Sequence, residues 1–420
     1  MVKFIHCADL HLGATFKSVA AKCDAETKKI IADSTLLSWQ KLVDKAITLK
    51  VDFVLIAGDI FDNPMPLLKQ RMSFKNGVDK LSEANIRVFA TSGNHDNNIK
   101  IFEDFSFSDK VKFFSAEKVE TIELPELKTI VAGISYHNDN AAENLSKYFN
   151  GNNLNENYFK IALLHANIGG TSSYGDNDEI GCYSNCRLSD LSSAKFDYWA
   201  LGHIHNGGIL RSEKPQIVYS GSLQGLNINQ DTPKGAYLVK VDESLQTEIE
   251  FIECSTIDFV SLEIDLSDVD SDRTFADKIA IETEKVAELH KNCELIFTEV
   301  TLSGRSDYCR KLLNEARQEI IQELKLIAGD RFFINNLKLN LYRKLDKNTL
   351  LANNPLLGDI LSVDESGEAT KTFLKEKIMI LKNKFPLAEF YSEEEIDNLI
   401  QQGKETLFGI FADNQQDEVQ

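Results

Sequence analysis

The sequence predicts a layered α/β protein that is followed by a small α+β domain. Short apolar runs alternate with amphipathic stretches over residues 2–91, which is typical of parallel strands joined by helices. Strand-like runs then dominate from residue 111 to residue 254, and two such halves can stack as an α/β sandwich. Residues 259–341 repeat strand and helix in the order β-α-β-α-β, which indicates a smaller domain of its own.

The first part of the chain alternates strands with helices. Residues 2–8, 53–57 and 87–91 are apolar and rich enough in β-branched residues to be buried strands. Between them, residues 25–50 and 67–84 carry apolar side chains at helical intervals, separated by charged ones. Strand, helix and strand form a βαβ unit, so we expect a parallel sheet in a doubly wound or layered fold.

The second part of the chain is rich in strands. Its strand-like runs cover residues 111–115, 119–124, 129–135, 159–164, 198–201, 217–220, 235–241 and 247–254. Residues 169–186 are rich in Gly, Ser, Asn and Asp, which predicts a long surface loop. The small domain is predicted as strands at 259–265, 294–302 and 332–341 with helices at 273–290 and 306–326.

These patterns divide the chain into three predicted regions. Residues 1–256 form the layered domain, residues 257–345 the α+β domain, and residues 346–420 a helical C-terminal segment. Within the last region, residues 370–383 and 393–407 are amphipathic, and their apolar stripes serve either as core or as a partner-binding face.

Composition limits the classes of function. The net charge of −19 opposes contact with a phosphate backbone, and the chain has no polybasic run. No apolar run is long enough to span a membrane, and no secretory signal precedes the first strand, so we expect a cytoplasmic protein. Seven scattered cysteines then predict free thiols. The pair Cys182 and Cys186 lacks two further zinc ligands at matching spacing.

Polar side chains that can bind metals follow five of the strand-like runs. They are Asp9 and His11; Asp59; Asn94, His95 and Asp96; His165; and His203 and His205. Open α/β sheets place their ligands just beyond the carboxyl ends of strands. A single Gly-Asp turn after a strand is common, but five such ends are hard to obtain from core packing alone. His6 alternates away from Asp9 along its strand and is expected to be structural.

The mixture of ligands indicates a transition-metal site. Imidazole, carboxylate and one amide oxygen suit Mn²⁺, Fe²⁺ or Zn²⁺ better than Ca²⁺. Seven ligands are too many for one tetrahedral ion, but they make two sets of four if Asp59 is shared. A water between two cations about 3.5–4 Å apart is acidified and becomes a nucleophile for phosphorus.

His95 is the histidine that remains once the ligands are assigned. A free imidazole beside the metals can protonate a leaving alkoxide or stabilise a charged phosphorane. Asp96 could fix the tautomer of His95, as carboxylates do for other catalytic histidines. The alternative is that His95 only supports the ligands structurally.

The motifs that carry these residues resemble a known family. The series Asp9-x-His11, Gly58-Asp59-x-x-Asp62, Gly93-Asn94-His95-Asp96, His165 and Gly202-His203-x-His205 resembles the signature of calcineurin-type metallophosphoesterases. The flanking residues 4–13, 57–62 and 219–225 are similar to SbcD-type DNA-repair nuclease subunits, including the bacterial YhaO branch. The resemblance implies a four-layer α/β/β/α metallophosphoesterase sandwich, followed by a small α+β cap domain and a helical C-terminal segment.

The resemblance also implies roles for individual residues. One metal would take Asp9, His11, Asp59 and His205, and the other would take Asp59, Asn94, His165 and His203. His95 would be the catalytic histidine. The family implies two divalent ions, with Mn²⁺ the expected pair and Fe²⁺ or Zn²⁺ as alternatives.

The activity implied by the resemblance is exonuclease or endonuclease cleavage of DNA phosphodiesters in DNA repair. The implied partners are DNA, a coiled-coil SMC-like ATPase of the SbcC/YhaN type docked through the C-terminal helices, and a second copy of the chain. Asp62 and Asn227 depart from the family pattern at places where some relatives carry histidine or basic residues. Three alternatives stay open: a phosphatase, a cyclic-nucleotide phosphodiesterase, and an inactive scaffold subunit for the ATPase.

Overall fold

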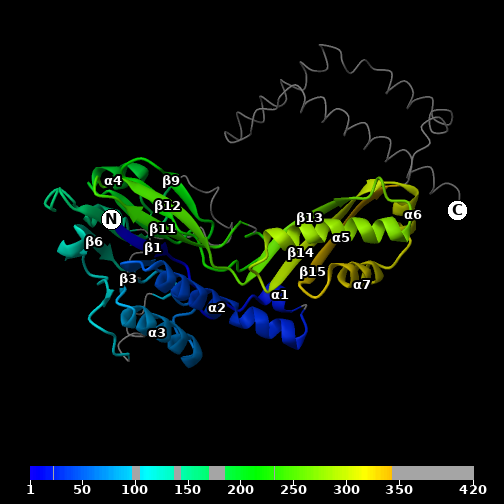
Figure 1. Ribbon diagram of the computed structural model, residues 1–420, viewed down its shortest axis with the longest axis horizontal. Helices are drawn as coiled ribbons and strands as arrows, with labels where there is room; N and C mark the ends of the chain where they lie inside the picture. The colour runs from blue at the N-terminus through cyan, green and yellow to red at the C-terminus, as the bar shows by residue number, and fades with distance from the viewer. Residues whose placement is uncertain (22, 97–104, 137–142, 170–184, 231, 343–420) are drawn as a thin grey trace, which may run out of the picture. The chain divides into compact units, whose positions relative to one another are not determined.

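A computed structural model describes residues 1–21, 23–96, 105–136, 143–169, 185–230 and 232–342 (Figure 1). By their packing these residues fall into two compact units. The first comprises Met1–Leu262, Glu282–Val300 and Glu323–Leu337, and the second comprises Glu263–Ile281, Thr301–Gln322 and, among the described residues, Lys338–Tyr342. The helices predicted at 370–383 and 393–407 and most of the loop predicted at 169–186 lie outside the described residues.

The first sheet of the first unit has six strands in the order β12-β11-β1-β2-β3-β4. Its strands are β1 (Val2–Cys7), β2 (Phe53–Ala57), β3 (Arg87–Thr91), β4 (Val111–Phe113), β11 (Gly235–Val241) and β12 (Thr247–Glu253). The strands β1 to β4 pair in parallel, as the βαβ pattern predicts. The chain returns much later to add β11 and β12 as antiparallel strands beside β1.

The second sheet also has six strands, in the order β5-β6-β7-β8-β10-β9. They are β5 (Glu120–Leu124), β6 (Thr129–Ile134), β7 (Phe159–His165), β8 (Tyr198–Gly202), β9 (Gly208–Arg211) and β10 (Gln216–Tyr219). The central strands β6, β7, β8 and β10 are parallel neighbours, so the carboxyl ends of β7 and β8 lie at one edge. The outer strands β5 and β9 are antiparallel to their neighbours.

Three apolar clusters stack these elements as α/β/β/α. Helices α2 (Ala25–Leu49) and α3 (Leu68–Glu83) cover one face of the first sheet, with Trp39 and Phe74 stacked 5.4 Å apart in that cluster (Figure 1). The second cluster lies between the sheets, where Phe4 contacts Phe53 and Tyr198. The third lies on the outer face of the second sheet, under η3 (Leu145–Tyr148) and α4 (Leu188–Ser193). The four-layer fold predicted from the sequence is thereby confirmed.

The helix α2 has defined ends. Asp24 accepts a hydrogen bond from the backbone N–H of Thr27 at 2.8 Å, which caps the first turn. Lys50 adopts the left-handed conformation that commonly ends helices. Both α2 and α3 begin and end within one residue of the boundaries predicted from the sequence.

A third sheet contains β13 (Ile257–Asp265), β14 (Leu295–Arg305) and β15 (Phe332–Tyr342) in that order. Helix α5 (Asp272–Leu289) precedes β14, as predicted. The single helix predicted at 306–326 is wrong, because the chain forms α6 (Asp307–Leu313) and α7 (Arg317–Ala328). The amide of Asn314 bonds the Arg310 carbonyl and Glu319 accepts from the Ala316 N–H, so side chains satisfy backbone groups at the break.

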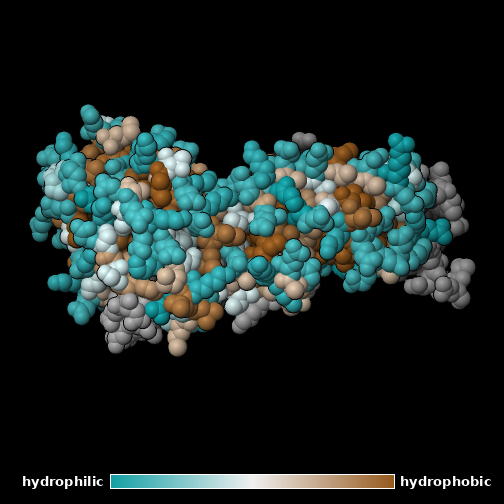
Figure 2. All heavy atoms as spheres, turned by 60° about the horizontal axis from the view of Figure 1, so that its bottom comes forward, coloured by the Kyte–Doolittle hydropathy of each residue, from teal (hydrophilic) through white to brown (hydrophobic). Residues whose placement is uncertain are grey.

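Figure 2 shows that the visible face is mainly hydrophilic, with hydrophobic patches between the hydrophilic residues. None of the described helices is both long and apolar enough to cross a membrane.

His6 is buried between the two six-stranded sheets as a neutral imidazole. Its Nε2 lies 3.2 Å from the carbonyl of Leu201, which only accepts, so Nε2 carries the proton and donates. Its Nδ1 then accepts from the Tyr198 hydroxyl at 3.0 Å. Burial lowers the pKa of His6 to about 3, against a weaker opposing effect of the Leu201 bond.

This buried histidine predicts a loss of stability in acid. The unfolded chain binds a proton at His6 below about pH 6.5 and the folded chain does not until about pH 3, so stability falls as the pH falls through that window. The slope is at most about 1.4 kcal/mol per pH unit. Substitution His6→Gln keeps a donor and an acceptor but does not titrate. We expect its denaturant-derived stability to decline less than the wild-type value between about pH 6.5 and pH 5. Equal slopes for the two proteins would contradict a neutral His6.

Candidate active site

The predicted polar residues meet at one edge of the two sheets. The parallel strands β1, β2 and β3 deliver Asp9 and His11, Asp59, and Asn94 to Asp96 beyond their carboxyl ends. The parallel strands β7 and β8 deliver His165, His203 and His205 from the second sheet. Asp9, His11, Asp59 and His165 are each only 1 % exposed.

The backbone at this edge is unusual. Asp9, His11, Asp59 and His203 have positive φ angles of 49°, 40°, 51° and 98°. Side-chain-bearing residues rarely adopt this region, and it costs free energy wherever they do. Only glycine fits at position 93, because the Cβ atom of any other residue would lie 2.1 Å from Asp59 Oδ1. The local folding therefore aims the side chains at one point at the expense of relaxed backbone geometry.

Asp59 lies at the centre of the group. Its Oδ2 is 3.3 Å from His165 Nε2 and 3.8 Å from His11 Nε2. Its Oδ1 accepts a hydrogen bond of 2.9 Å from the backbone N–H of His95. A single carboxylate thus faces histidines that come from both sheets.

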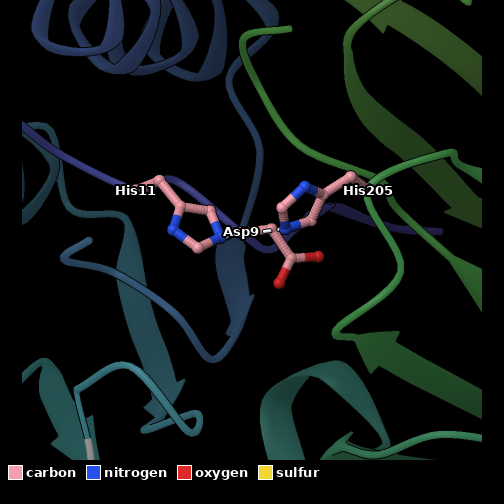
Figure 3. Close-up of side chains that lie close together, drawn as sticks. All are labelled: Asp9, His11 and His205. Atoms are coloured by element: carbon pink, nitrogen blue, oxygen red, sulfur yellow. Dashed lines mark hydrogen bonds between the residues drawn. The ribbon is translucent and has the colours of Figure 1, made fainter. Parts of the chain in front are cut away.

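A second group forms around Asp9. The ligand atoms of Asp9, His11 and His205 all lie within 4.8 Å of one another. Figure 3 shows the His11 and His205 rings pointing toward each other, with the carboxylate of Asp9 beside them; the two Nε2 atoms are 3.0 Å apart. The backbone N–H of His203 donates to both oxygens of Asp9, at 3.0 and 3.1 Å, which fixes that carboxylate.

The remaining predicted ligands surround His165. Its Nδ1 donates to the carbonyl of Ala57 at 2.8 Å, so Nε2 is the atom directed into the site. The Oδ1 atom of Asn94 lies 3.0 Å from this Nε2. The ring of His203 is 5.3 Å from the ring of His165. All seven predicted ligands are therefore brought together.

Burial and mutual charge determine the protonation of these groups. Burial raises the pKa of Asp9 to about 6. Burial also opposes ionisation of Asp59, but His165 and His11 hold its pKa well below the usual range. The neighbouring carboxylates raise the pKa values of His11 and His165 to about 9, although burial acts in the opposite direction. The buried carboxylates thus need positive charge nearby.

This arrangement fits divalent cations. Buried carboxylates that face imidazole nitrogens, with one amide oxygen, form the donor set that borderline transition metals take. A cation would replace the positive charge that protonated histidines otherwise supply.

The structure corrects the role predicted for Asp96. Nδ1 of His95 lies 3.2 Å from the backbone carbonyl of Asp62 and donates to it, so that carbonyl sets the tautomer. Asp96 instead accepts backbone N–H bonds from Ile60 at 2.6 Å and Gly93 at 2.7 Å. Asp96 thus holds the loops after β2 and β3 together, a role that adjacency to His95 could not reveal.

Two positioning residues escaped the sequence analysis. Gln230 Nε2 lies 2.9 Å from His205 Nδ1, and the buried Lys234 donates to the His205 carbonyl at 3.1 Å. Neither follows the carboxyl end of a strand or lies in a recognisable motif. The side chain of Asp62 lies within the predicted motif, and it accepts from His11 Nδ1 at 3.2 Å.

Comparison with known proteins identifies a matching family and several relatives. Residues 2–207 match the model of the calcineurin-like phosphoesterase family. The chain is 31 % identical over 247 residues to the uncharacterized metallophosphoesterase YhaO of Bacillus subtilis, an alignment that covers 57 % of each protein. It is 29 % identical over 273 residues to the DNA double-strand break repair protein Mre11 of Methanocaldococcus jannaschii, which covers 62 % of this chain and 69 % of Mre11.

Among solved structures, a dimetal phosphatase from Danio rerio matches with a TM-score of 0.36 and 11 % identity, over 60 % of this chain and 99 % of the phosphatase. Residues 2–207 therefore form a calcineurin-like phosphoesterase domain, and the chain is similar to YhaO and Mre11.

Proposed function

We propose that this protein is a two-metal phosphodiesterase that cleaves DNA in repair, with Mn²⁺ as its metal. The observation that carries the proposal is the position of Asp59, whose Oδ2 lies within 4 Å of both His11 and His165. A carboxylate in that position can be shared by two cations. Two cations, when bound, would lower the pKa of a water and offset the charge of a phosphoryl group.

The distances support the ligand sets that the family resemblance implies. Asp9, His11 and His205 form one compact group, and Asp9, Asp59 and His165 form another. Following the family resemblance, we assign Asp9, His11, Asp59 and His205 to one ion, and Asp59, Asn94, His165 and His203 to the other, with Asp9 close to members of both sets.

His95 is proposed as the catalytic histidine. Its Nδ1 proton is engaged by the Asp62 carbonyl, which leaves Nε2 to take up or release a proton. Its ring lies 4.8 Å from the His11 ring and is half-buried, so it is close to the ligands but still open to a substrate.

The proposal that DNA is the substrate is based on the similarity to known proteins. Mre11 is named as a protein of DNA double-strand break repair. The alignment with YhaO spans only 57 % of the length of YhaO, so the activity of a whole relative is a proposal for this chain. The net charge of −19 opposes DNA binding by the chain alone. We therefore propose that a coiled-coil ATPase supplies DNA contacts, and that it docks on region 346–420. Regions 1–256 and 257–345 would be the nuclease and cap domains.

The same acidity favours a second candidate, a phosphatase or cyclic-nucleotide phosphodiesterase, whose small substrate needs no extended basic surface. One experiment separates the candidates. The purified chain is incubated with Mn²⁺, Fe²⁺ or Zn²⁺ and with linear duplex DNA, single strands, a cyclic dinucleotide or a simple phosphodiester. The proposal requires cleavage of DNA with Mn²⁺. Hydrolysis of only the small substrates supports the second candidate, and no hydrolysis in any mixture supports a scaffold role.

Gln230 gives a prediction for the metal centre. Its amide holds the ring of His205 and its Oε1 accepts from the Leu226 N–H at 2.9 Å. Substitution Gln230→Ala should weaken metal binding by about 10–100-fold, since residues that orient ligands have effects of this size. The carboxylate of Gln230→Glu can accept from the Leu226 N–H and from a protonated His205 Nδ1, which leaves the His205 Nε2 free to bind a metal, so this variant should recover most of the affinity. Calorimetric titration with Mn²⁺ tests both, with the exposed Asn229→Ala as the matched control. Equal affinities for all four proteins would exclude this role.

A further inference from the structure

A second cluster of metal-ligating side chains lies outside the phosphoesterase site, within the first unit. Glu253 ends β12, Asp258 lies in β13, and His290 and Cys293 lie in the loop between α5 and β14. We propose that these four residues form a zinc site that fastens this loop to the strands beside it. The family comparison does not assign this cluster, because the matching model ends at residue 207.

The four side chains meet at the carboxylate of Asp258. Its Oδ2 is 2.7 Å from His290 Nδ1 and 2.9 Å from Cys293 Sγ. Ligand atoms of Glu253, Asp258 and Cys293 all lie within 4.8 Å of one another. The ligand atoms of these three residues can share one cation, since zinc–ligand bonds are about 2.0–2.3 Å long, and His290 lies beside the group through its bond to Asp258.

The framework holds the cluster in place. The guanidinium of Arg331 donates to the carbonyls of both His290 and Cys293, at 2.9 and 3.1 Å. The N–H of Cys293 closes a turn onto the His290 carbonyl at 3.0 Å. Asn292 donates to Glu253 Oε2 at 2.8 Å. Ligands whose backbone is fixed in advance lose little entropy when an ion arrives.

The donor set selects the ion. One thiol, one imidazole and two carboxylates match the sulfur, nitrogen and oxygen ligands of four-coordinate zinc, whereas Mn²⁺ and Mg²⁺ favour oxygen. Without an ion, hydrogen bonds from His290 and Cys293 meet at the carboxylate of Asp258. Zinc would take the place of these protons, and the Cys293 thiol would lose its proton on binding.

Cys293 is not arranged as a nucleophile. Burial and the charge of Asp258 raise the pKa of its thiol, and the thiol donates to a carboxylate rather than to an imidazole base. The thiol is only 4 % exposed, which also denies access to a substrate. A structural metal therefore accounts for this combination of groups better than catalysis does.

Cobalt is the probe that isolates this site. The full chain is stripped with a chelator and titrated with Co²⁺, and the near-ultraviolet absorption is followed for a thiolate-to-cobalt charge-transfer band. None of the residues assigned to the phosphoesterase centre is a cysteine, so cobalt there gives no such band. We expect the band in the wild type, its complete loss in Cys293→Ser, and its retention in the matched controls Cys309→Ser and Cys182→Ser.

Further variants keep the test independent of folding. Cys293→His should still bind cobalt but without the charge-transfer band, and Asp258→Asn should weaken the binding that gives rise to the band. Equimolar Zn²⁺ should raise the melting temperature of the stripped wild type but not that of Cys293→Ser, while Mn²⁺-dependent hydrolysis stays the same in both. The absence of a thiolate band in the wild type, or its survival in Cys293→Ser, would overturn the proposal.

Discussion

Substitution Asp59→Ala is expected to remove both metal ions and all phosphodiesterase activity. The carboxylate lies within 4 Å of His165 and His11, so it is the ligand that both ions would share. Its loss also leaves those histidines without the carboxylate that now pairs with them. Metal content measured by calorimetry with Mn²⁺, together with hydrolysis of a simple phosphodiester, tests the expectation.

Two controls separate this effect from damage to the fold. Asp59→Asn keeps an oxygen for the His95 N–H and tolerates the left-handed backbone, but it cannot bridge cations as a carboxylate does. It should fold like the wild type and still lose the ions. Asp33→Ala, on the surface helix α2, should keep both ions and full activity. Retention of two ions by Asp59→Ala would break the bridging assignment.

Substitution His95→Ala should abolish most of the activity while both ions still bind. His95 contributes a proton-carrying nitrogen and not a ligand in our assignment, and general acid–base groups account for about 10²–10⁴-fold in rate. The chemical step should therefore slow by that factor, with little change in the affinity for Mn²⁺.

The ring of His95 is close enough to His11 and Asp59 to be an alternative ligand, so metal content decides the matter. Full activity in His95→Ala would refute the catalytic role. Loss of an ion together with activity would instead make His95 a ligand. The variant His95→Gln, which offers a polar side chain without an imidazole proton, should be as inactive as His95→Ala.

The sequence alone predicted the fold and the convergence of the proposed metal ligands. Buried apolar runs such as Phe53–Ala57 identify strands by themselves, and the carboxyl ends of parallel strands share one edge. The convergence of five polar strand ends in one chain can therefore be predicted from the sequence. The return of β11 and β12 to the edge of β1 was not predictable, because pairing over such a separation leaves no local pattern.

The sequence could not predict contacts between side chains that are far apart along the chain. Asp96 is adjacent to His95 but bonds the backbone after β2, whereas Gln230 reaches His205 from a loop with no motif. The zinc cluster joins Glu253 to Cys293 across a strand and a helix, and the spacing of its ligands matches no familiar zinc pattern. In each case the partner is chosen by tertiary packing, which periodicity and propensity do not encode.

The left-handed backbone at Asp9, His11, Asp59 and His203 has an evolutionary consequence. Conformations of this kind cost about 1–3 kcal/mol each, so the reactive edge is formed at a cost in stability. Selection for heat resistance alone should therefore enrich glycine or asparagine at these four positions. The selected variants would be more stable but catalytically inactive. Thermal stability and catalytic activity would therefore place opposing demands on the backbone at these four residues.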